Sequence, residues 1–189
     1  MSVEIVPMAV QTTAIEGLLV ITTKAVTDDR GTVREFFRTS GFAEAGVPVP
    51  DRWAQVNMTW THQGGLRGLH AEAMTKLVGV AAGEAFGAYA DARPDSPTRG
   101  ASVTVPLTVG TQVLVPQGVA NGFQAVSEGG CQYVYLFDAE WVPGMAGVGI
   151  TPLDPDLAIA WPITPAVDDP SMVSAKDASA PPLAQVLAR

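Results

Sequence analysis

Lys76-Leu77-Val78-Gly79-Val80, followed shortly by Ala85-Phe86-Gly87-Ala88-Tyr89, is the stretch that decides the fold. Both runs have strand length, carry valine or aromatic residues and end near turn residues, which predicts two β-strands. Working outward, the same features recur in four more runs, at Leu18–Ile21, Ser102–Val105, Gln112–Val115 and Tyr133–Phe137. Evenly spaced strands without helical patterns between them predict an all-β sandwich, barrel or jelly roll. Short helices are expected only at 36–45 and in the tail at 181–189.

The length of 189 residues fits one domain with a sizeable core. We therefore predict a single domain over residues 1–189. The stretch 162–170, rich in Pro and Asp, is interpreted as a surface connection. It leads to a short C-terminal segment, about 163–189, that is expected to pack back on the domain.

Charge and cysteine content exclude several classes of protein. The net charge of −8 argues against binding of nucleic acid or an anionic membrane, because phosphate binding needs dense Lys and Arg. A small phosphorylated ligand needs only a few basic groups placed locally, so it stays compatible. With one cysteine no intrachain disulfide can form, which favours a reducing compartment. Since no signal peptide or membrane span is apparent, we expect a cytoplasmic protein.

The stretch from Gly64 to His70 contains side chains suited to acid–base chemistry and to anion binding. It carries Arg67 and one of the two histidines, and Lys76 follows six residues after His70. Three such side chains on two apolar runs can converge on one side of a sheet, which suits an anionic substrate that must lose a proton. His70 then acts as a general base. A buried histidine satisfied by hydrogen bonds is the competing interpretation, and is the commoner one for a lone histidine in an apolar run.

Other candidates are ambiguous when read alone. His62 lies in an expected turn, and two histidines eight residues apart are too few for a typical jelly-roll metal site, so no metal is expected. Tyr135 is interpretable as sheet packing or as a phenolic acid. Trp141 suits either the core or stacking on a flat base or sugar. Asp177 resembles an exposed polar tail, and nothing local shows that it reaches His70.

Several motifs occur in a specific order along nearly the whole chain. They are Asp29-Arg30-Gly31 with Glu35, Gln55 and Asn57; Leu66-Arg67-Gly68-Leu69-His70; Lys76-Leu77-Val78; Val115-Pro116-Gln117-Gly118; Tyr135; Leu153-Asp154-Pro155-Asp156-Leu157; and Ser174-Ala175-Lys176-Asp177. With this joint order the chain resembles the dTDP-4-dehydrorhamnose 3,5-epimerase family. The resemblance implies a cupin-type jelly roll with a few short helices, mainly toward the N-terminal third and the C-terminus.

The resemblance also implies an activity. The substrate is a nucleotide-linked 4-keto-6-deoxyhexose, whose keto group acidifies the hydrogens at C3 and C5. His70 removes a proton, Asp177 orients and stabilises the imidazole, and Tyr135 returns a proton from the opposite ring face. Lys76 stabilises the enolate or the diphosphate, and Arg67 pairs with the diphosphate. The reaction, in L-rhamnose or related deoxysugar biosynthesis, needs neither a cofactor nor a metal.

Nucleotide-binding positions follow from the same resemblance. They are Arg30, Glu35, Gln55, Asn57 and Lys176, with Trp141 stacking on the thymine. A homodimer is implied, in which Arg30 and Glu35 come from the partner subunit. Four of the eleven basic residues, Arg30, Arg67, Lys76 and Lys176, then gather in an anion pocket on an acidic protein.

Some positions depart from the family pattern. Asn121 stands where a histidine is usual; its amide can donate a hydrogen bond to a sugar oxygen but cannot become cationic. Thr32 replaces an aromatic residue, and Ala146 replaces a glutamate. These departures keep three alternatives open: an epimerase acting at C3 or C5 only, a 3,4-ketoisomerase, and a sugar-nucleotide binding module without catalysis.

Overall fold

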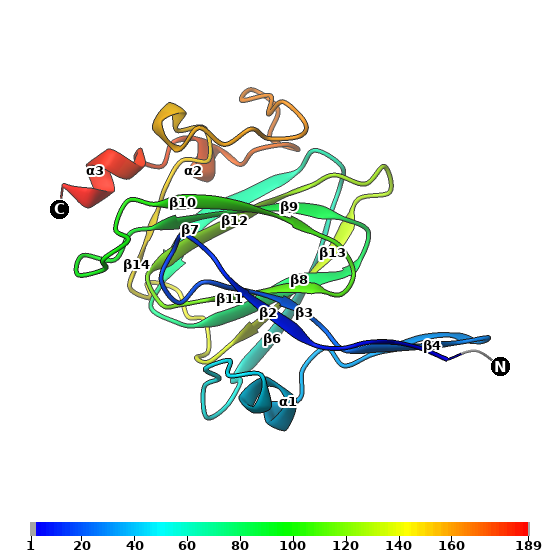
Figure 1. Cartoon of the computed structure of the whole chain (residues 1–189). Coiled ribbons are helices and arrows are strands. Elements are labelled where there is room, and N and C mark those ends of the chain that lie inside the picture. The colour runs from blue at the N-terminus through cyan, green and yellow to red at the C-terminus, as the bar shows by residue number, and fades with distance from the viewer. Residues whose placement is uncertain (1–2, 189) are drawn as a thin grey trace.

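Two antiparallel sheets face each other in this protein, whose computed structural model describes residues 3–188. One sheet has six strands in the order β2-β3-β11-β8-β13-β6, and the other has five in the order β10-β9-β12-β7-β14. A third sheet, β1-β4-β5, extends away from them (Figure 1). The strands are β1 Glu4–Val6, β2 Ala9–Thr12, β3 Leu19–Thr22, β4 Ala25–Asp28, β5 Gly31–Arg34, β6 Gln55–Thr61, β7 Leu66–Glu72, β8 Lys76–Ala82, β9 Ala85–Asp91, β10 Ser102–Leu107, β11 Thr111–Val115, β12 Val119–Ala125, β13 Cys131–Phe137 and β14 Gly147–Gly149.

Helices are few and short. They are α1 Thr39–Glu44, the 3-10 helix η1 Pro155–Leu157, α2 Ala175–Ala178 and α3 Leu183–Leu187. In the part of the chain described here, no helix combines the length and apolar character needed to cross a membrane.

The predicted all-β jelly roll with short helices is confirmed. All six runs singled out in the sequence are strands, and α1 and α3 fall within the two expected helical stretches. The expectation that helix occurs only there is wrong, because η1 and α2 are single turns, each begun by a local cap, Asp154 or Ser174. The sequence did not single out β6 or β12, both of which line the space between the sheets described below.

Alternation along the strands separates an inner and an outer face. On β8, Val78 and Val80 point between the sheets and join the main core, while Leu77 packs outward in a second cluster with Phe42 of α1. Because side chains alternate along a strand, Lys76 shares the inner face with Val78. The same rule sets Tyr135 of β13 on the inner face.

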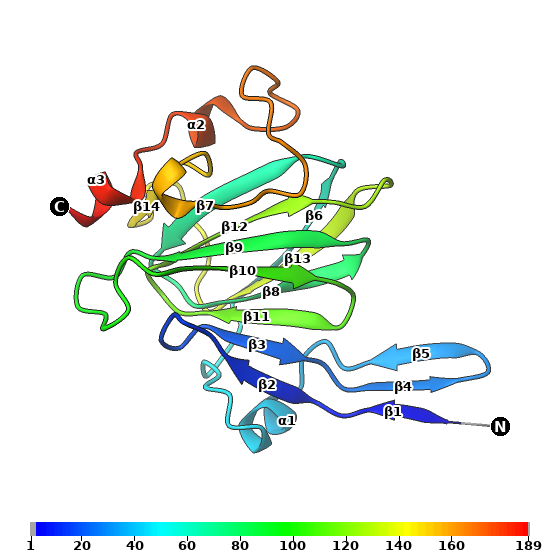
Figure 2. The ribbon, with the colours of Figure 1, turned by 45° about the horizontal axis from the view of Figure 1, so that its top comes forward.

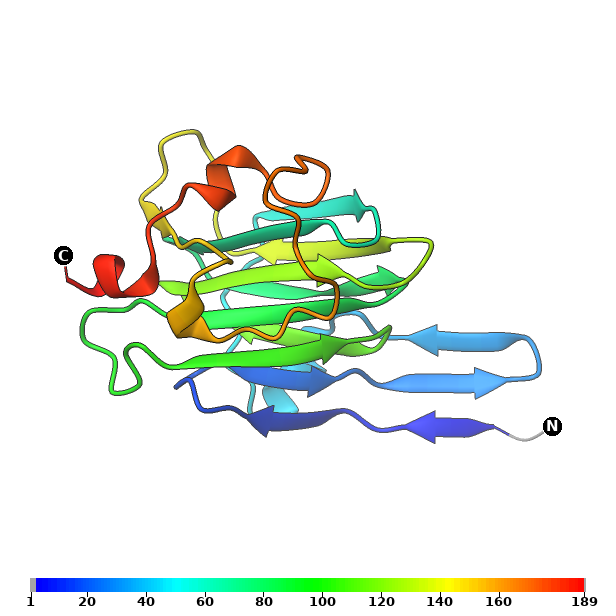
Figure 3. The same ribbon diagram turned by 90° about the horizontal axis from the view of Figure 1, so that it is seen from above.

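The β1-β4-β5 sheet, called the arm below, leaves the body at one corner (Figure 2). Both Ile5 and Val33 on it are more than half exposed. Arg30 lies in the turn between β4 and β5, at the tip of the arm (Figure 3).

The C-terminal segment crosses the outer face of the five-stranded sheet (Figure 3). Leu183 and Val186 of α3 pack with Leu69 of β7 and Ile150 in one buried cluster. A parallel bridge between Leu66 and Val173 ties the segment to the start of β7. This burial fixes the position of α2, which lies between those two anchors along the chain.

An irregularity in β7 changes which residues face inward. Asn121 of β12 pairs with His70, but Phe123 pairs with Arg67, so three steps on β7 match two on β12. A bulge of this kind reverses the alternation, and Arg67 therefore faces the same cavity as His70. Gly68, inside the bulge, has a φ of +114°.

We predict that Gly68→Ala is strongly destabilising. A Cβ at Gly68 would lie 2.6 Å from Gly122 Cα and 2.7 Å from Asn121 O, both backbone atoms, and the positive φ disfavours any side chain. The expected loss is about 2 kcal/mol or more in the free energy of unfolding, measured by denaturant titration. Gly129→Ala is the control, because a Cβ there meets nothing within 4 Å. Equal stability of the two variants would contradict this assignment.

Candidate active site

A cavity of about 380 Å³ opens between the two sheets. The five-stranded sheet contributes Arg67, His70 and Glu72 from β7 and Asn121 from β12. The facing sheet contributes Asn57 and Thr59 from β6, Lys76 from β8 and Tyr135 from β13. Trp141 and Asp177, from outside the strands, also line the cavity. Eight of the twelve residues proposed from the sequence thus surround one cavity: Asn57, Arg67, His70, Lys76, Asn121, Tyr135, Trp141 and Asp177.

Asp177 reaches His70 from the C-terminal segment. His70 Nε2 donates to Asp177 Oδ1 at 2.7 Å, and the Gly68 amide donates to Asp177 Oδ2 at 3.4 Å. The side chain of Ser174 caps α2 by accepting from the Asp177 amide, which orients the carboxylate. The tail that resembles exposed polar sequence therefore supplies a buried carboxylate to the inner face of β7.

The protonation of this pair follows from its contacts. Partial burial acts to raise the pKa of Asp177, but the hydrogen bond and charge of His70 and the Gly68 amide outweigh it, so that pKa lies below its ordinary value. An ionised carboxylate only accepts, so Nε2 of His70 carries the proton. In the neutral ring Nδ1 is then the basic nitrogen, and within residues 3–188 it has no hydrogen-bond partner. His70 is therefore set up to accept a proton from a ligand.

Lys76 lies at the base of the cavity with only 3% of its side chain exposed. Its Nζ contacts Glu72 Oε2 at 2.5 Å, Asn121 Oδ1 at 2.7 Å and the His70 carbonyl at 3.2 Å. Because lysine only donates, the amide oxygen of Asn121 must face it, and the amide nitrogen is left for other acceptors. Burial lowers the pKa of Lys76, and Glu72 opposes that shift.

Tyr135 faces His70 from the opposite sheet. Burial raises the pKa of Tyr135, with partial opposition from Thr59 and Arg67, so the phenol keeps its proton at neutral pH. A protonated hydroxyl can donate to a ligand lying between the sheets. The cavity thus has a basic nitrogen on one wall and a proton donor on the other.

The rim is linked by side-chain hydrogen bonds. The Trp141 amide donates to Gln55 Oε1 at 2.8 Å, and Gln55 Nε2 donates to Asn57 Oδ1 at 2.9 Å. The indole nitrogen of Trp141 donates to Glu72 Oε1 at 3.1 Å. Gln55 therefore borders the cavity through Trp141, whose indole is 48% exposed and presents a flat surface at the rim.

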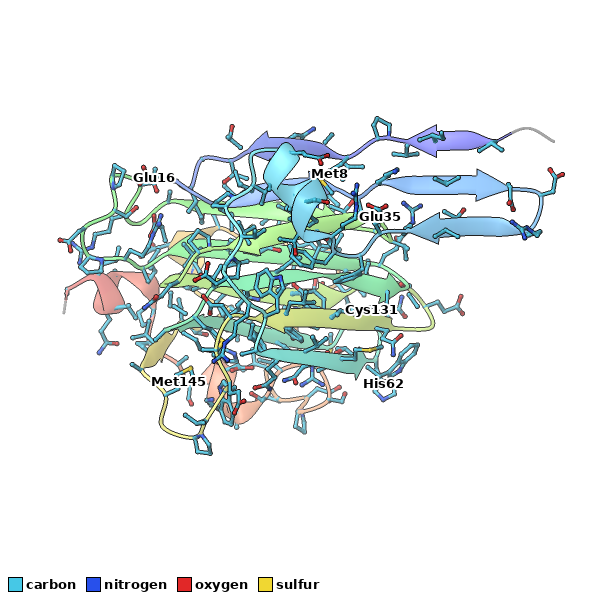
Figure 4. All side chains as sticks on the ribbon, turned by 90° about the horizontal axis from the view of Figure 1, so that it is seen from below. Met8, Glu16, Glu35, His62, Cys131 and Met145 are labelled. Carbon is cyan, nitrogen blue, oxygen red and sulfur yellow. The ribbon has the colours of Figure 1, made fainter. Side chains whose placement is uncertain are left out.

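Three predicted residues lie away from the cavity of this chain. Arg30, at the tip of the arm, pairs with Asp28 and has 90% of its side chain exposed. Glu35 lies where the arm joins the body (Figure 4) and pairs with Arg38 and Lys24. Lys176 is exposed on α2. Of the four basic residues expected in the anion pocket, one chain brings only Arg67 and Lys76 to it.

Sequence reasoning missed Thr59, Thr61 and Glu72, which line the cavity. The signal for the two threonines is present in β6, where apolar residues alternate with Asn57, Thr59 and Thr61. Polar residues face the cavity there and apolar ones face outward, which inverts the usual pattern. The hydroxyl of Thr59 is buried beside Tyr135, where it acts to lower the pKa of that phenol.

Metal-binding side chains do not cluster in the described ranges: no three His, Cys, Asp or Glu residues are grouped as ligands between residues 3 and 188. His62 follows directly after β6 (labelled in Figure 4) and is not among the residues that line the cavity.

Comparison with known proteins gives a consistent result. The sequence model for dTDP-4-dehydrorhamnose 3,5-epimerase matches residues 12–185. A relative with that name from Methanothermobacter thermautotrophicus is 35% identical over 90% of this chain and 92% of its own length. A dTDP-4-dehydro-6-deoxyglucose 3-epimerase from Streptomyces bikiniensis is 34% identical over 83% of this chain and 80% of its own length. The 3,5-epimerase RmlC of Legionella pneumophila, solved with dTDP-4-keto-L-rhamnose, superimposes with a TM-score of 0.82 at 35% identity, covering 95% and 97%.

We predict that Asp177→Asn lowers stability in a pH-dependent way. Because the folded-state pKa of Asp177 is lowered, the carboxylate stabilises the fold at pH values above its ordinary pKa. That contribution is lost as the pH falls through the lowered value. The melting temperature of the variant should lie below that of the parent at pH 7, and the gap should narrow toward pH 3. A gap of constant size across this range would contradict the ionised pair.

Proposed function

The chain belongs to the dTDP-4-dehydrorhamnose 3,5-epimerase family, and from this premise we propose how its residues invert C3 and C5 of a dTDP-4-dehydro-6-deoxyhexose. It is an isomerase of deoxysugar biosynthesis. The observation that carries the assignment of roles is the pair of acid–base groups on facing sheets, His70 on one and Tyr135 on the other.

Proton removal is the task of His70. The 4-keto group makes the hydrogens at C3 and C5 acidic, because the negative charge left on carbon moves onto the keto oxygen. His70 Nδ1 takes the proton, and the resulting imidazolium is stabilised by Asp177 at 2.7 Å. The charge of Lys76 and the free amide N–H groups of Asn121 stabilise the enolate oxygen.

Inversion requires that the proton return from the other face of the ring. Tyr135 donates its hydroxyl proton to the same carbon, and the enolate becomes a ketone again. A ring held between the sheets has His70 toward one face and Tyr135 toward the other, so the carbon changes configuration. The protein recovers its starting protonation state by exchange with water.

Two cationic side chains are available to a nucleotide ligand in the cavity of this acidic protein. The net charge is −8, and Arg67 and Lys76 both line the cavity, together with the carboxylates of Glu72 and Asp177. Arg67 is assigned to the diphosphate, for which its guanidinium geometry is suited, and Trp141 to stacking on the base. We also propose a cytoplasmic location, since the single cysteine fits a reducing compartment.

One relative motivates a narrower alternative. The Streptomyces bikiniensis protein, 34% identical, is named a 3-epimerase. In this chain the amide of Asn121, which does not titrate, contacts Lys76 near the assigned keto oxygen. An enzyme inverting C3 alone would use the same first proton removal.

The test is incubation with dTDP-4-dehydro-6-deoxyglucose in deuterated water, followed by NMR of the sugar. We expect deuterium at C3 and C5; deuterium at C3 alone would select the narrower activity, and none at either carbon would refute both. His70→Ala should abolish exchange. Tyr135→Phe should slow inversion by about 100-fold or more while sparing initial proton removal. Equal loss of both steps would contradict the role of Tyr135.

We further propose that the protein is a symmetric homodimer. The outer face of β6 exposes Val56, Met58 and Trp60, each more than half accessible. The arm exposes apolar side chains as well. Adjacent apolar residues of this kind mark an interaction surface, and β6 is the edge strand of its sheet. An arm from a second copy, laid over β6, would cover these residues and bring Arg30 and Glu35 toward the other cavity.

Light scattering after gel filtration tests the dimer. We expect a mass of twice 19.7 kDa for the parent and 19.7 kDa for the double variant Met58→Asp, Trp60→Asp. Charges on this face would have to be desolvated at the contact, which disfavours association. Val167→Asp, a change at another exposed valine, should leave the mass unchanged. A parent that runs at 19.7 kDa refutes the proposal.

A further inference from the structure

Glu72 is a carboxylate inside a cavity assigned to an anionic ligand, and the reaction described above gives it no task. It ends β7 on the inner face, and 22% of its side chain is exposed. A negative charge there repels a diphosphate, so its presence needs an explanation. Its two oxygens have different partners: Oε2 contacts Lys76 Nζ at 2.5 Å, and Oε1 accepts from Trp141 Nε1 at 3.1 Å.

Lys76 requires such a partner. A lysine with 3% of its side chain exposed loses most of its hydration, and without a counter-charge its ammonium is disfavoured. The other two contacts of Nζ, Asn121 Oδ1 and the His70 carbonyl, are neutral. Since an ammonium has three protons, these three acceptors use all of them. Lys76 therefore acts on a ligand through its charge, and Glu72 is the one acceptor that stabilises this charge as an anion.

The carboxylate is held in place from the rim. Trp141 Nε1 occupies Oε1, which turns Oε2 toward Lys76. The Trp141 backbone is itself tied to Gln55 at 2.8 Å. A single side chain thus joins the cation at the base of the cavity to the aromatic ring at its entrance.

We propose that Glu72 is a positioning residue that keeps Lys76 protonated in the active site and so preserves activity at alkaline pH. The proposal rests on the function assigned above for its catalytic consequence, but not for the ionisation of Lys76. Other titratable or charged groups lining the cavity are Arg67 and His70 on β7, Tyr135 on β13 and Asp177 on α2. Among them Asp177 is paired with His70, so it is not available as the counter-charge of Lys76.

The direct test is an NMR titration of protein labelled with ¹³C at lysine Cε. The chain has three lysines, Lys24, Lys76 and Lys176, and the two outside the cavity serve as internal references. Glu72→Gln preserves the shape of the side chain and removes its charge. We expect the pKa of Lys76 to fall by about one unit or more, in the range typical of losing an adjacent opposite charge.

Glu140→Gln is the matched control. It removes the same charge from the exposed residue next to Trp141 and should leave the Lys76 titration unchanged. Thermal melts verify that each variant is folded; if Glu72→Gln is not, Glu72→Ala takes its place with the same expectation. A Lys76 titration that moves no more than in Glu140→Gln overturns the proposal.

The second measurement is the pH profile of kcat for deuterium exchange. In Glu72→Gln, the alkaline limb of the kcat profile should move to lower pH by the same amount as the pKa of Lys76 in the NMR titration. A merely structural role of Glu72 would instead lower kcat equally at all pH values. A shifted Lys76 pKa with an unmoved limb refutes the catalytic part. If the parent shows no exchange at all, the assigned reaction fails, while the NMR result still decides whether Glu72 sustains the charge of Lys76.

Discussion

A hydrogen bond between residues 107 positions apart holds the candidate active site together: His70 Nε2 to Asp177 Oδ1. It forms only if the C-terminal segment lies across the five-stranded sheet, and that segment is held there by apolar contacts. Leu69 and His70 are neighbours on β7 and face opposite ways. Leu69 packs outward with Leu183 and Val186, while His70 faces the cavity. Hydrophobic burial on one side of the strand therefore sets the position of the carboxylate that is hydrogen-bonded to His70, the proposed base, on the other.

The polar side chains of the cavity are tolerated because apolar residues farther along the same strands form the main core and stabilise the fold. On β8, Lys76 lies in the cavity and Val78 and Val80 lie in the main core. On β13, Tyr135 lines the cavity, whereas Tyr133 stacks on Phe123 with ring centroids 3.8 Å apart. Burying a lysine or a carboxylate without partners is costly, and here each is paired. The site is preorganised because its polar groups already hold one another.

Strands with apolar side chains on their inward face were predicted from the sequence, whereas β6, whose inward side chains are polar, was not. Val78, Val113 and Leu136 lie in apolar runs, and their strands were found. In β6 apolar residues alternate with Asn57, Thr59 and Thr61, which is the pattern of a strand. Its orientation is what the sequence leaves open, because this pattern ordinarily places the apolar side chains inside, and here the polar ones line the cavity.

Prediction of the site had a different limit. Local sequence around Asp177 indicates an exposed tail, because no short-range pattern reports a contact 107 residues away. Resemblance to a family supplied that link. Neither the local sequence nor the resemblance pointed to Glu72. It is acidic among basic candidates, and its contact with Lys76 arises from the turn between β7 and β8. A residue proposed to act through the charge of a buried neighbour is hard to find from sequence, because its role depends on the burial of that neighbour.

The net charge of the cavity in a single chain bears on the proposed dimer. The cavity of one chain is lined by two cations, Arg67 and Lys76, and by two carboxylates, Glu72 and Asp177, so with a neutral His70 it carries no net charge. A nucleotide diphosphate brings about two or three negative charges and binds where cations outnumber carboxylates. Arg30 is exposed at the end of the arm, and the arm also exposes the apolar side chains of Ile5 and Val33. In the proposed dimer, the contact that covers the outer face of β6 would also deliver the positive charge that the cavity of a single chain lacks.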